Sequence, residues 1–209
     1  MKWNEYLAEL REELQDTGST PRWSDTVLRM YTRDAIYDYS RWLPRRVDRY
    51  ALTTLASTYA LPSDFIEDVA VEYPLGNFLM RGEIRPAWRL NPINYPAWYV
   101  IANGALRLNC DPPAEPIYLT YLAYHKMMTE TEDTSVPDFD IEIIRLYVMA
   151  MVHRQLRAKQ SRLDRFDSTA GRRDDNPLTP ETDNFMEEYY RKISERIRGG
   201  AVYLYRSMT

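Results

Sequence analysis

The chain has 209 residues, of which 44% are hydrophobic, so it can bury a sizeable core in one domain or two. A formal net charge of -4 excludes an overall positive field that would gather nucleic acid or hold the chain on an anionic membrane. No apolar run approaches the roughly 20 residues of a bilayer span, and the N-terminus lacks the features of a secretory signal. We therefore expect that the protein is made in a cytoplasm-like compartment and stays there. We expect no association with a membrane.

Two amphipathic helices are predicted at the N-terminal end. The first runs from about Trp3 to Leu14, where apolar residues recur at helical spacing among glutamates. Ser24 is placed to cap the second helix, which Pro44 closes.

From about Val47 the pattern changes from helical to alternating, which predicts strands over Arg49–Tyr59 and Asp68–Tyr73. The dipeptide Asn103-Gly104 predicts a two-residue hairpin turn, because both residues adopt positive φ at little cost. That turn sets Ala102 opposite Ala105, Ile101 opposite Leu106 and Tyr99 opposite Leu108. The segment Ile117–Tyr124 is apolar on both faces, so we expect it in the middle of the sheet.

Helical periodicity returns after an acidic linker. Asp138 is placed to cap a helix with a broad apolar face between Ile143 and Val152. Thr179 and Pro180 begin a last helix, which we expect to stop at Gly199-Gly200. Behind the two glycines, residues 201–209 form an apolar, tyrosine-bearing tail that can dock on its own domain or on a neighbouring chain.

Together these elements predict an α+β fold: a helical frame of about four helices with an inserted antiparallel β-sheet and a C-terminal tail. The expected organisation is residues 1–46 for the N-terminal helices, 47–128 for the β-rich insertion, 129–198 for the C-terminal helices and 199–209 for the tail or arm.

Motifs of catalysis are not found in the sequence. It has no glycine-rich phosphate loop, metal-ligand quartet or nucleophile elbow, and the single cysteine, Cys110, is interpreted as a small buried residue. The two histidines, His125 and His153, are interpreted as structural. We expect no catalytic residue, no metal and no cofactor; a hydrolase whose carboxylates are assembled only by folding stays an alternative.

Two arginine clusters leave a nucleic-acid interpretation open. Arginine binds phosphate through two parallel hydrogen bonds, but both clusters are interleaved with aspartates and can equally form a solvated surface. The candidates for a DNA channel or a subunit interface are Arg41, Arg45, Arg46, Arg154, Arg157 and Arg162. A module that binds nucleic acid directly is therefore an alternative function.

Aromatic residues are abundant, with 17 tyrosines and five tryptophans. Their large rings with polar tips suit surfaces that are buried in a complex. Any tryptophan that is not used in the core is a candidate interface anchor: Trp3, Trp23, Trp42, Trp88 and Trp98.

Four segments resemble the head-to-tail connector, or adaptor, proteins of tailed bacteriophages. They are the helical run Tyr31–Pro44, the corner Tyr59–Ile66, the strand Val71–Pro74 and the strand Leu106–Asn109 that leads to a proline pair. The order of elements is also similar to that of the connector proteins: two helices, a β-rich insertion and two further helices with a tail.

The resemblance implies a structural virion protein of the neck, made in the cytoplasm of the bacterial host, with no enzymatic activity. It implies a homo-oligomeric ring of about twelve copies beneath the portal, joined to a downstream tail or nozzle protein and surrounding packaged double-stranded DNA in its exit channel. It also implies portal binding by the tail, through Ala201, Val202, Tyr203, Leu204, Tyr205 and Arg206. A tail-tube or gatekeeper subunit of the same neck is the alternative.

Overall fold

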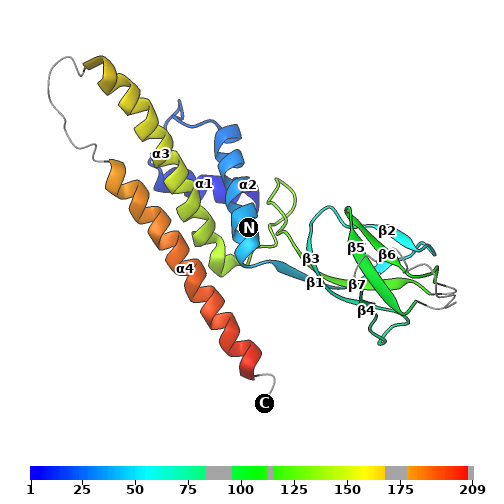
Figure 1. Cartoon of the computed structure of the whole chain (residues 1–209). Coiled ribbons are helices and arrows are strands. Elements are labelled where there is room, and N and C mark those ends of the chain that lie inside the picture. The colour runs from blue at the N-terminus through cyan, green and yellow to red at the C-terminus, as the bar shows by residue number, and fades with distance from the viewer. Residues whose placement is uncertain (83–95, 113–114, 168–177, 207–209) are drawn as a thin grey trace. The chain divides into compact units, whose positions relative to one another are not determined.

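The computed structural model describes residues 1–82, 96–112, 115–167 and 178–206. The chain divides into two compact units (Figure 1). One comprises Met1–Leu43 and His125–Thr209 and is helical, and the other comprises Pro44–Tyr124 and is built of strands. The predicted α+β class is confirmed.

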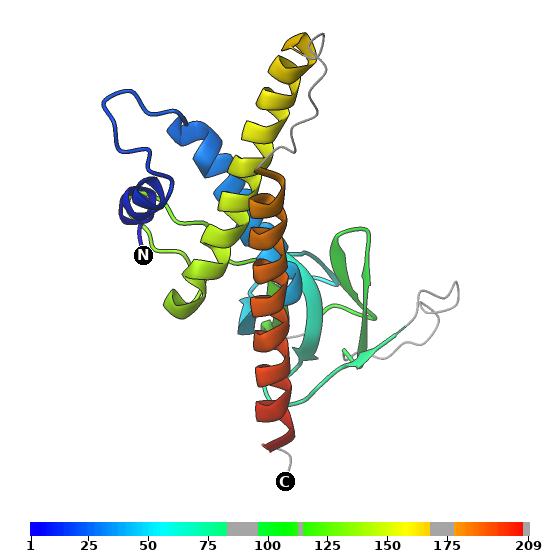
Figure 2. The same cartoon turned by 90° about the vertical axis from the view of Figure 1, so that its left-hand side faces the viewer.

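Within the described residues, the helical unit contains four α-helices: α1 (Trp3–Glu13), α2 (Asp25–Trp42), α3 (Ile141–Asp167) and α4 (Leu178–Arg206). Ser24 caps α2 as predicted, because its hydroxyl oxygen accepts a hydrogen bond from the backbone nitrogen of Val27. Helices α3 and α4 run antiparallel and side by side, as Figure 2 shows. The start of α3 therefore meets the later part of α4.

The core of this unit gathers the apolar faces of all four helices. Tyr39 of α2, Ile144 of α3 and Tyr189 of α4 are almost fully buried in it, together with Trp3 and Leu10 of α1. Burial of this apolar surface, at about 25 cal/mol per Å², is the main stabilising contribution to the unit.

Two predicted helix boundaries are wrong. Asp138 does not cap α3; it lies in a short 3₁₀ turn, Asp138–Asp140, that precedes this helix. The last helix does not stop at Gly199-Gly200, because α4 continues to Arg206. Gly199 does not take the positive φ of a glycine that ends a helix, and a glycine inside a helix costs only about 1 kcal/mol. The predicted tail is therefore helical in its backbone as far as Arg206.

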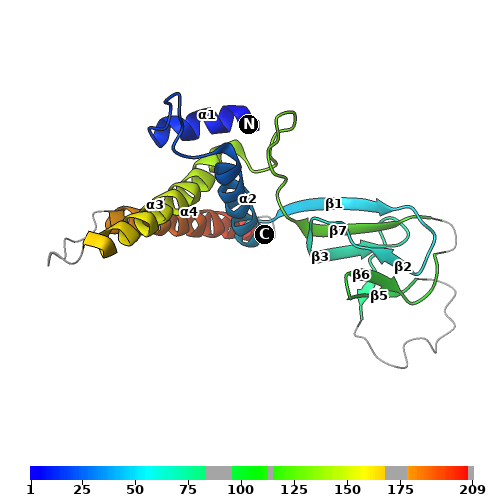
Figure 3. The same ribbon diagram turned by 90° about the horizontal axis from the view of Figure 1, so that it is seen from above.

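The β unit contains a three-stranded antiparallel sheet in the order β1 (Arg45–Leu52), β7 (Ile117–Ala123) and β3 (Phe65–Glu72), which is seen from above in Figure 3. Strand β7 is central, as predicted. Leu119 in its middle has no exposed surface.

A second sheet has the order β2 (Thr58–Ala60), β6 (Ala105–Leu108), β5 (Trp98–Ala102) and β4 (Met80–Arg81). The β5–β6 hairpin has the predicted register, and its turn residues Asn103 and Gly104 have φ values of 52° and 72°. Strand β4 runs parallel to β5, so the sheets are antiparallel except at this pair.

The predicted strand Arg49–Tyr59 is only partly correct. Strand β1 ends at Leu52, and β2 begins at Thr58 in the other sheet. A bulge interrupts β1 between Val47 and Tyr50, where Arg49 has a φ of 51° and its backbone nitrogen donates to Thr120 Oγ1 at 3.2 Å. Period-2 patterning does not reveal such a bulge, because only the facing strand provides its hydrogen-bond partner.

Candidate functional site

The predicted arginine candidates at the start of the β unit are neutralised within the chain. Arg45 donates from Nη2 to Asp64 Oδ2 at 2.7 Å, and Arg46 donates from Nε to Asp48 Oδ1 at 2.7 Å. A guanidinium that already binds a carboxylate is a weaker ligand for phosphate, because the pair must first be broken. These two arginines therefore offer less positive charge than the sequence suggested.

The remaining candidates lie on helices. Arg41 is exposed at the end of α2, and Arg154 is exposed on α3. The backbone of α3 includes Arg157 and Arg162, but their side chains lie outside the described residues. The same holds for the side chains of Ala201–Arg206 on α4, so roles in DNA contact and portal binding stay predictions.

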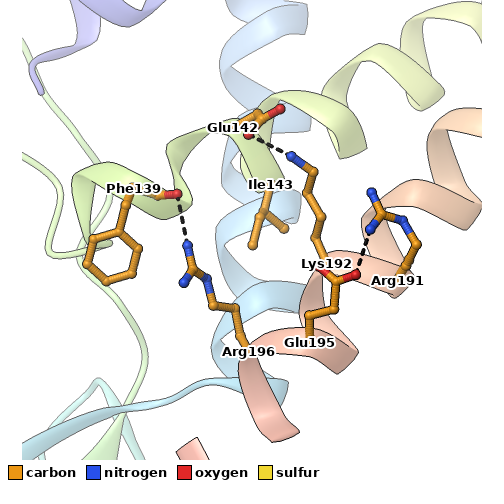
Figure 4. Close-up of a pocket in the computed structure, with 7 residues that line it drawn as sticks. All are labelled: Phe139, Glu142, Ile143, Arg191, Lys192, Glu195 and Arg196. Atoms are coloured by element: carbon orange, nitrogen blue, oxygen red, sulfur yellow. Dashed lines mark hydrogen bonds and ion pairs between the residues drawn. The ribbon is translucent and has the colours of Figure 1, made fainter. Parts of the chain in front are cut away.

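A pocket of about 320 Å³ lies between the start of α3 and the later part of α4, and Figure 4 shows the side chains around it. Its lining residues are Phe139, Glu142, Ile143, Arg191, Lys192, Glu195 and Arg196. The charges are paired across the helices and along α4: Lys192 Nζ lies 2.6 Å from Glu142 Oε2, and Arg191 Nη1 lies 2.6 Å from Glu195 Oε1. The hydrogen bond from Lys192 lowers the pKa of Glu142. The Lys192–Glu142 ion pair links α4 to α3. Because the charged groups of the pocket are paired with one another, the pocket is poorly suited to acid–base catalysis.

Beside this pocket, a buried carboxylate fastens three elements of the helical unit. The side chain of Asp140 is 4% exposed, and it accepts hydrogen bonds from the Tyr39 hydroxyl at 2.7 Å and from Arg196 Nε at 2.6 Å. The Arg196 guanidinium also lies over the Phe139 ring, 4.6 Å from its centroid. Burial, and then the bond to Asp140, raise the pKa of Tyr39. Asp140 is therefore a structural anchor for α4.

His125 has a structural environment as well. Its two ring nitrogens lie 2.8 Å from the carbonyl oxygen of Ser135 and 3.0 Å from that of Leu43. Its backbone nitrogen donates to Ser40 Oγ at 2.9 Å. His153 lies on α3, with its ring 5.2 Å from the ring of Phe185 on α4. Within the described residues, no group of three or more His, Cys, Asp or Glu side chains could hold a metal ion.

The sequence pattern did not predict which large apolar side chains are exposed on the surface. Of the candidate tryptophans, Trp3 and Trp23 are in the core, Trp98 is half-buried and only Trp42 is exposed; Trp88 lies outside the described residues. Among the side chains that the structure describes, the most exposed large apolar ones are Leu75, Phe78, Met80 and Phe139. In the sequence, the pattern of apolar and polar residues around these four positions does not distinguish them from positions in the core.

The family of the chain follows from its similarity to known proteins. None of the described helices is both long and apolar enough to cross a bilayer. The family model described as "SU10 adaptor protein" matches residues 1–205, whereas no curated protein matches the chain. The match covers both units and α4 almost to its end. The chain therefore belongs to the SU10 adaptor protein family and is a bacteriophage adaptor, a structural component of the virion.

Proposed function

We propose that this adaptor forms a ring, of about twelve copies, beneath the portal, where it joins the DNA-filled head to the tail and surrounds the DNA exit channel. The observation that carries the proposal is the family match over residues 1–205, which includes the helices and strands of both units. Its function is then binding without turnover: one surface holds the portal, another receives a tail or nozzle protein, and the flanks hold neighbouring copies.

The internal pairing of charges supports a binding role. The buried carboxylate Asp140 is satisfied by Tyr39 and Arg196, and Lys192 and Glu142, which line the pocket beside it, form an ion pair. General acid or base catalysis requires a positioned group with a free proton site, and these groups are already engaged. Exposed apolar side chains such as Phe78 and Phe139 are instead typical of protein interfaces.

The charge of the chain is also compatible with the passage of DNA through such a ring. A channel must let DNA slide, whereas a dense array of arginines bound to phosphates would hold it. The net charge is -4, and Arg45 and Arg46 are paired with aspartates. These observations support a lumen that surrounds DNA without binding it tightly.

The end of α4 is the proposed portal contact. Within the described residues, the last side chain of α4 seen to bond to another element is Arg196, with Asp140 and Phe139. The following segment, Ala201–Arg206, contains a valine, a leucine and two tyrosines. A helix end with apolar and aromatic residues is suited to a groove on another protein.

Deleting residues 201–209 is therefore expected to leave the fold intact and to abolish head-to-tail joining. The free energy of unfolding should change by less than about 0.5 kcal/mol, because the contacts of Tyr189, Lys192 and Arg196 remain. The matched control deletes only residues 207–209 and should retain attachment. The measurement is the fraction of particles with tails, counted by electron microscopy. Normal tail attachment after the longer deletion would defeat the proposed role of this segment.

A further inference from the structure

The ring of His125 is enclosed within the helical unit, at the point where the chain returns from the β unit. The helical unit stops at Leu43 before the β unit and resumes at His125 after it. His125 is only 9% exposed, and its backbone nitrogen donates to Ser40 Oγ at 2.9 Å. The Tyr39 ring of α2 lies 5.3 Å from the imidazole, centroid to centroid. The imidazole therefore has a defined orientation against the end of α2.

Both ring nitrogens of His125 face carbonyl oxygens. Nδ1 lies 2.8 Å from the carbonyl oxygen of Ser135, and Nε2 lies 3.0 Å from that of Leu43. A carbonyl oxygen can only accept a hydrogen bond, whereas a neutral imidazole has one N–H and one nitrogen with a lone pair. In the neutral form, one of the two contacts would therefore bring a lone pair against a carbonyl oxygen. Only the imidazolium, with a proton on each nitrogen, satisfies both contacts at once.

These two contacts join separate segments of the helical unit. Leu43 is the C-cap residue of α2, and Ser135 lies in the segment that leads to α3. Leu43 and His125 are also the residues that flank the β unit in the chain. The contact at Nε2 therefore ties together the points at which the chain leaves and re-enters the helical unit. We refer to His125 with the carbonyl groups of Leu43 and Ser135 as the His125 clamp.

The contact at Nδ1 holds one end of a loop, residues 126–136, which we call the linker loop. Ser135 Oγ accepts from the backbone nitrogen of Lys126 at 2.7 Å, and Thr134 Oγ1 donates to the carbonyl of Lys126 at 2.6 Å. The backbone nitrogen of Trp3 donates to the carbonyl of Thr129 at 3.0 Å, so the loop also binds the start of α1. A movement of Ser135 can therefore be passed to α1.

The elements packed against the clamp contribute other charged or titratable side chains. They are Tyr39 from α2, Lys126, Glu130 and Asp133 from the linker loop, Asp140 from the 3₁₀ turn and Arg196 from α4. Glu130 pairs with Arg29, and Asp133 pairs with the Met1 amino group. Asp140 accepts from Tyr39 and Arg196. Hydrogen bonds to the charged form favour that form, so the two carbonyl groups favour the imidazolium against the effect of burial.

We propose that His125 is a pH-sensitive clamp of the helical unit. In the closed state, the imidazolium donates to the carbonyls of both Leu43 and Ser135. When Nδ1 releases its proton to water, the Ser135 hydroxyl, 3.3 Å away, donates to the vacated lone pair and the Ser135 carbonyl moves off, while Nε2 stays bonded to Leu43. This device lies within one chain and does not depend on the proposed ring.

The direction of the pH effect follows from the preference for the charged ring. The folded state holds the second proton more tightly than the unfolded chain does. The contribution of the clamp to stability is therefore complete below about pH 6.5, where an unfolded histidine titrates, and is lost as the pH rises through the higher value of the folded protein. The linker loop and the start of α1 loosen over the same range.

NMR of the ring nitrogens in the full-length protein tests the clamp directly. The chain has two histidines, so isotope-labelled histidine gives two sets of signals, and His153→Gln removes one set and assigns the other. We expect His125 to titrate about one pH unit above the 6.5 of an ordinary histidine and its neutral form to keep the proton on Nε2. A His125 ring that is already neutral at about pH 6.5, or a neutral form protonated on Nδ1, would overturn the proposal.

Two further variants separate a pH-sensitive clamp from a merely structural histidine. Between about pH 5.5 and pH 8.5, the ratio of folded to unfolded protein should fall about tenfold more in the wild type than in His125→Gln, as measured by urea denaturation. Ser135→Ala keeps the carbonyl group but removes the hydroxyl that the neutral ring requires, so it should move the titration of His125 to still higher pH. An unchanged titration in Ser135→Ala, or the same pH dependence of stability in His125→Gln as in the wild type, would contradict the clamp.

Discussion

Replacing Asp140 with alanine is expected to lower the free energy of unfolding by about 2–4 kcal/mol. The substitution leaves the Tyr39 hydroxyl without its 2.7 Å acceptor, and Tyr39 is only 2% exposed. Arg196 also loses its 2.6 Å contact, but its side chain is 46% exposed and can turn to water. Most of the loss therefore comes from the buried hydroxyl and from the weaker attachment of α4.

Urea denaturation monitored by circular dichroism measures this loss. Asp138→Ala is the matched control, because Asp138 lies two residues away in the same 3₁₀ turn and its side chain is 90% exposed. We expect that control to change the free energy of unfolding by no more than about 0.5 kcal/mol. Equal losses in the two variants would show that Asp140 does not anchor α4.

Raising the pH above about 10 is expected to unfold the protein cooperatively. Burial first, and then hydrogen bonds to carboxylates, raise the pKa of four tyrosines, and for Tyr121 it reaches about 12. The pairs are Tyr39–Asp140, Tyr99–Asp68, Tyr121–Asp64 and Tyr189–Asp38. The folded state favours the neutral phenols. Their contribution to stability is complete below the unfolded pKa and is lost as the pH rises toward the folded values.

Ultraviolet absorbance of tyrosinate and circular dichroism, recorded together during an alkaline titration, check this expectation. The absorbance of these tyrosines should rise together with the loss of helical signal. Tyr121→Phe should move the midpoint to higher pH, because it removes one such phenol while Arg45 keeps Asp64 paired at 2.7 Å. Full titration of all tyrosines near pH 10 with an unchanged dichroism spectrum would contradict the account.

Elements whose signals are local could be predicted from the sequence. The turn at Asn103-Gly104 needs positive φ at two adjacent residues, and that requirement fixed the register of the whole β5–β6 hairpin. Ser24 caps α2 through a neighbour three residues away. The two-sided apolar pattern of Ile117–Tyr124 was sufficient to identify the central strand, which the structure shows as β7.

Features that depend on distant partners could not be predicted. Asp140 and Arg196 are 56 residues apart, so their contact appears only when α3 and α4 pack. The exposure of Phe78 and Met80 around a buried Leu79 depends on how the turn between β3 and β4 pairs with Val71, since apolar residues alone do not show which one faces the core. The predicted end of the last helix at Gly199-Gly200 is wrong, because the presence of a glycine does not determine whether it adopts the φ that ends a helix.

Electron cryomicroscopy of assembled particles is the most direct test of the central claim, that this adaptor forms the ring of the neck. We expect a closed ring of this chain between portal and tail, with the DNA channel on its axis and the end of α4 against the portal. A neck in which that ring is built from another protein, with this chain absent or attached elsewhere as single copies, would contradict it.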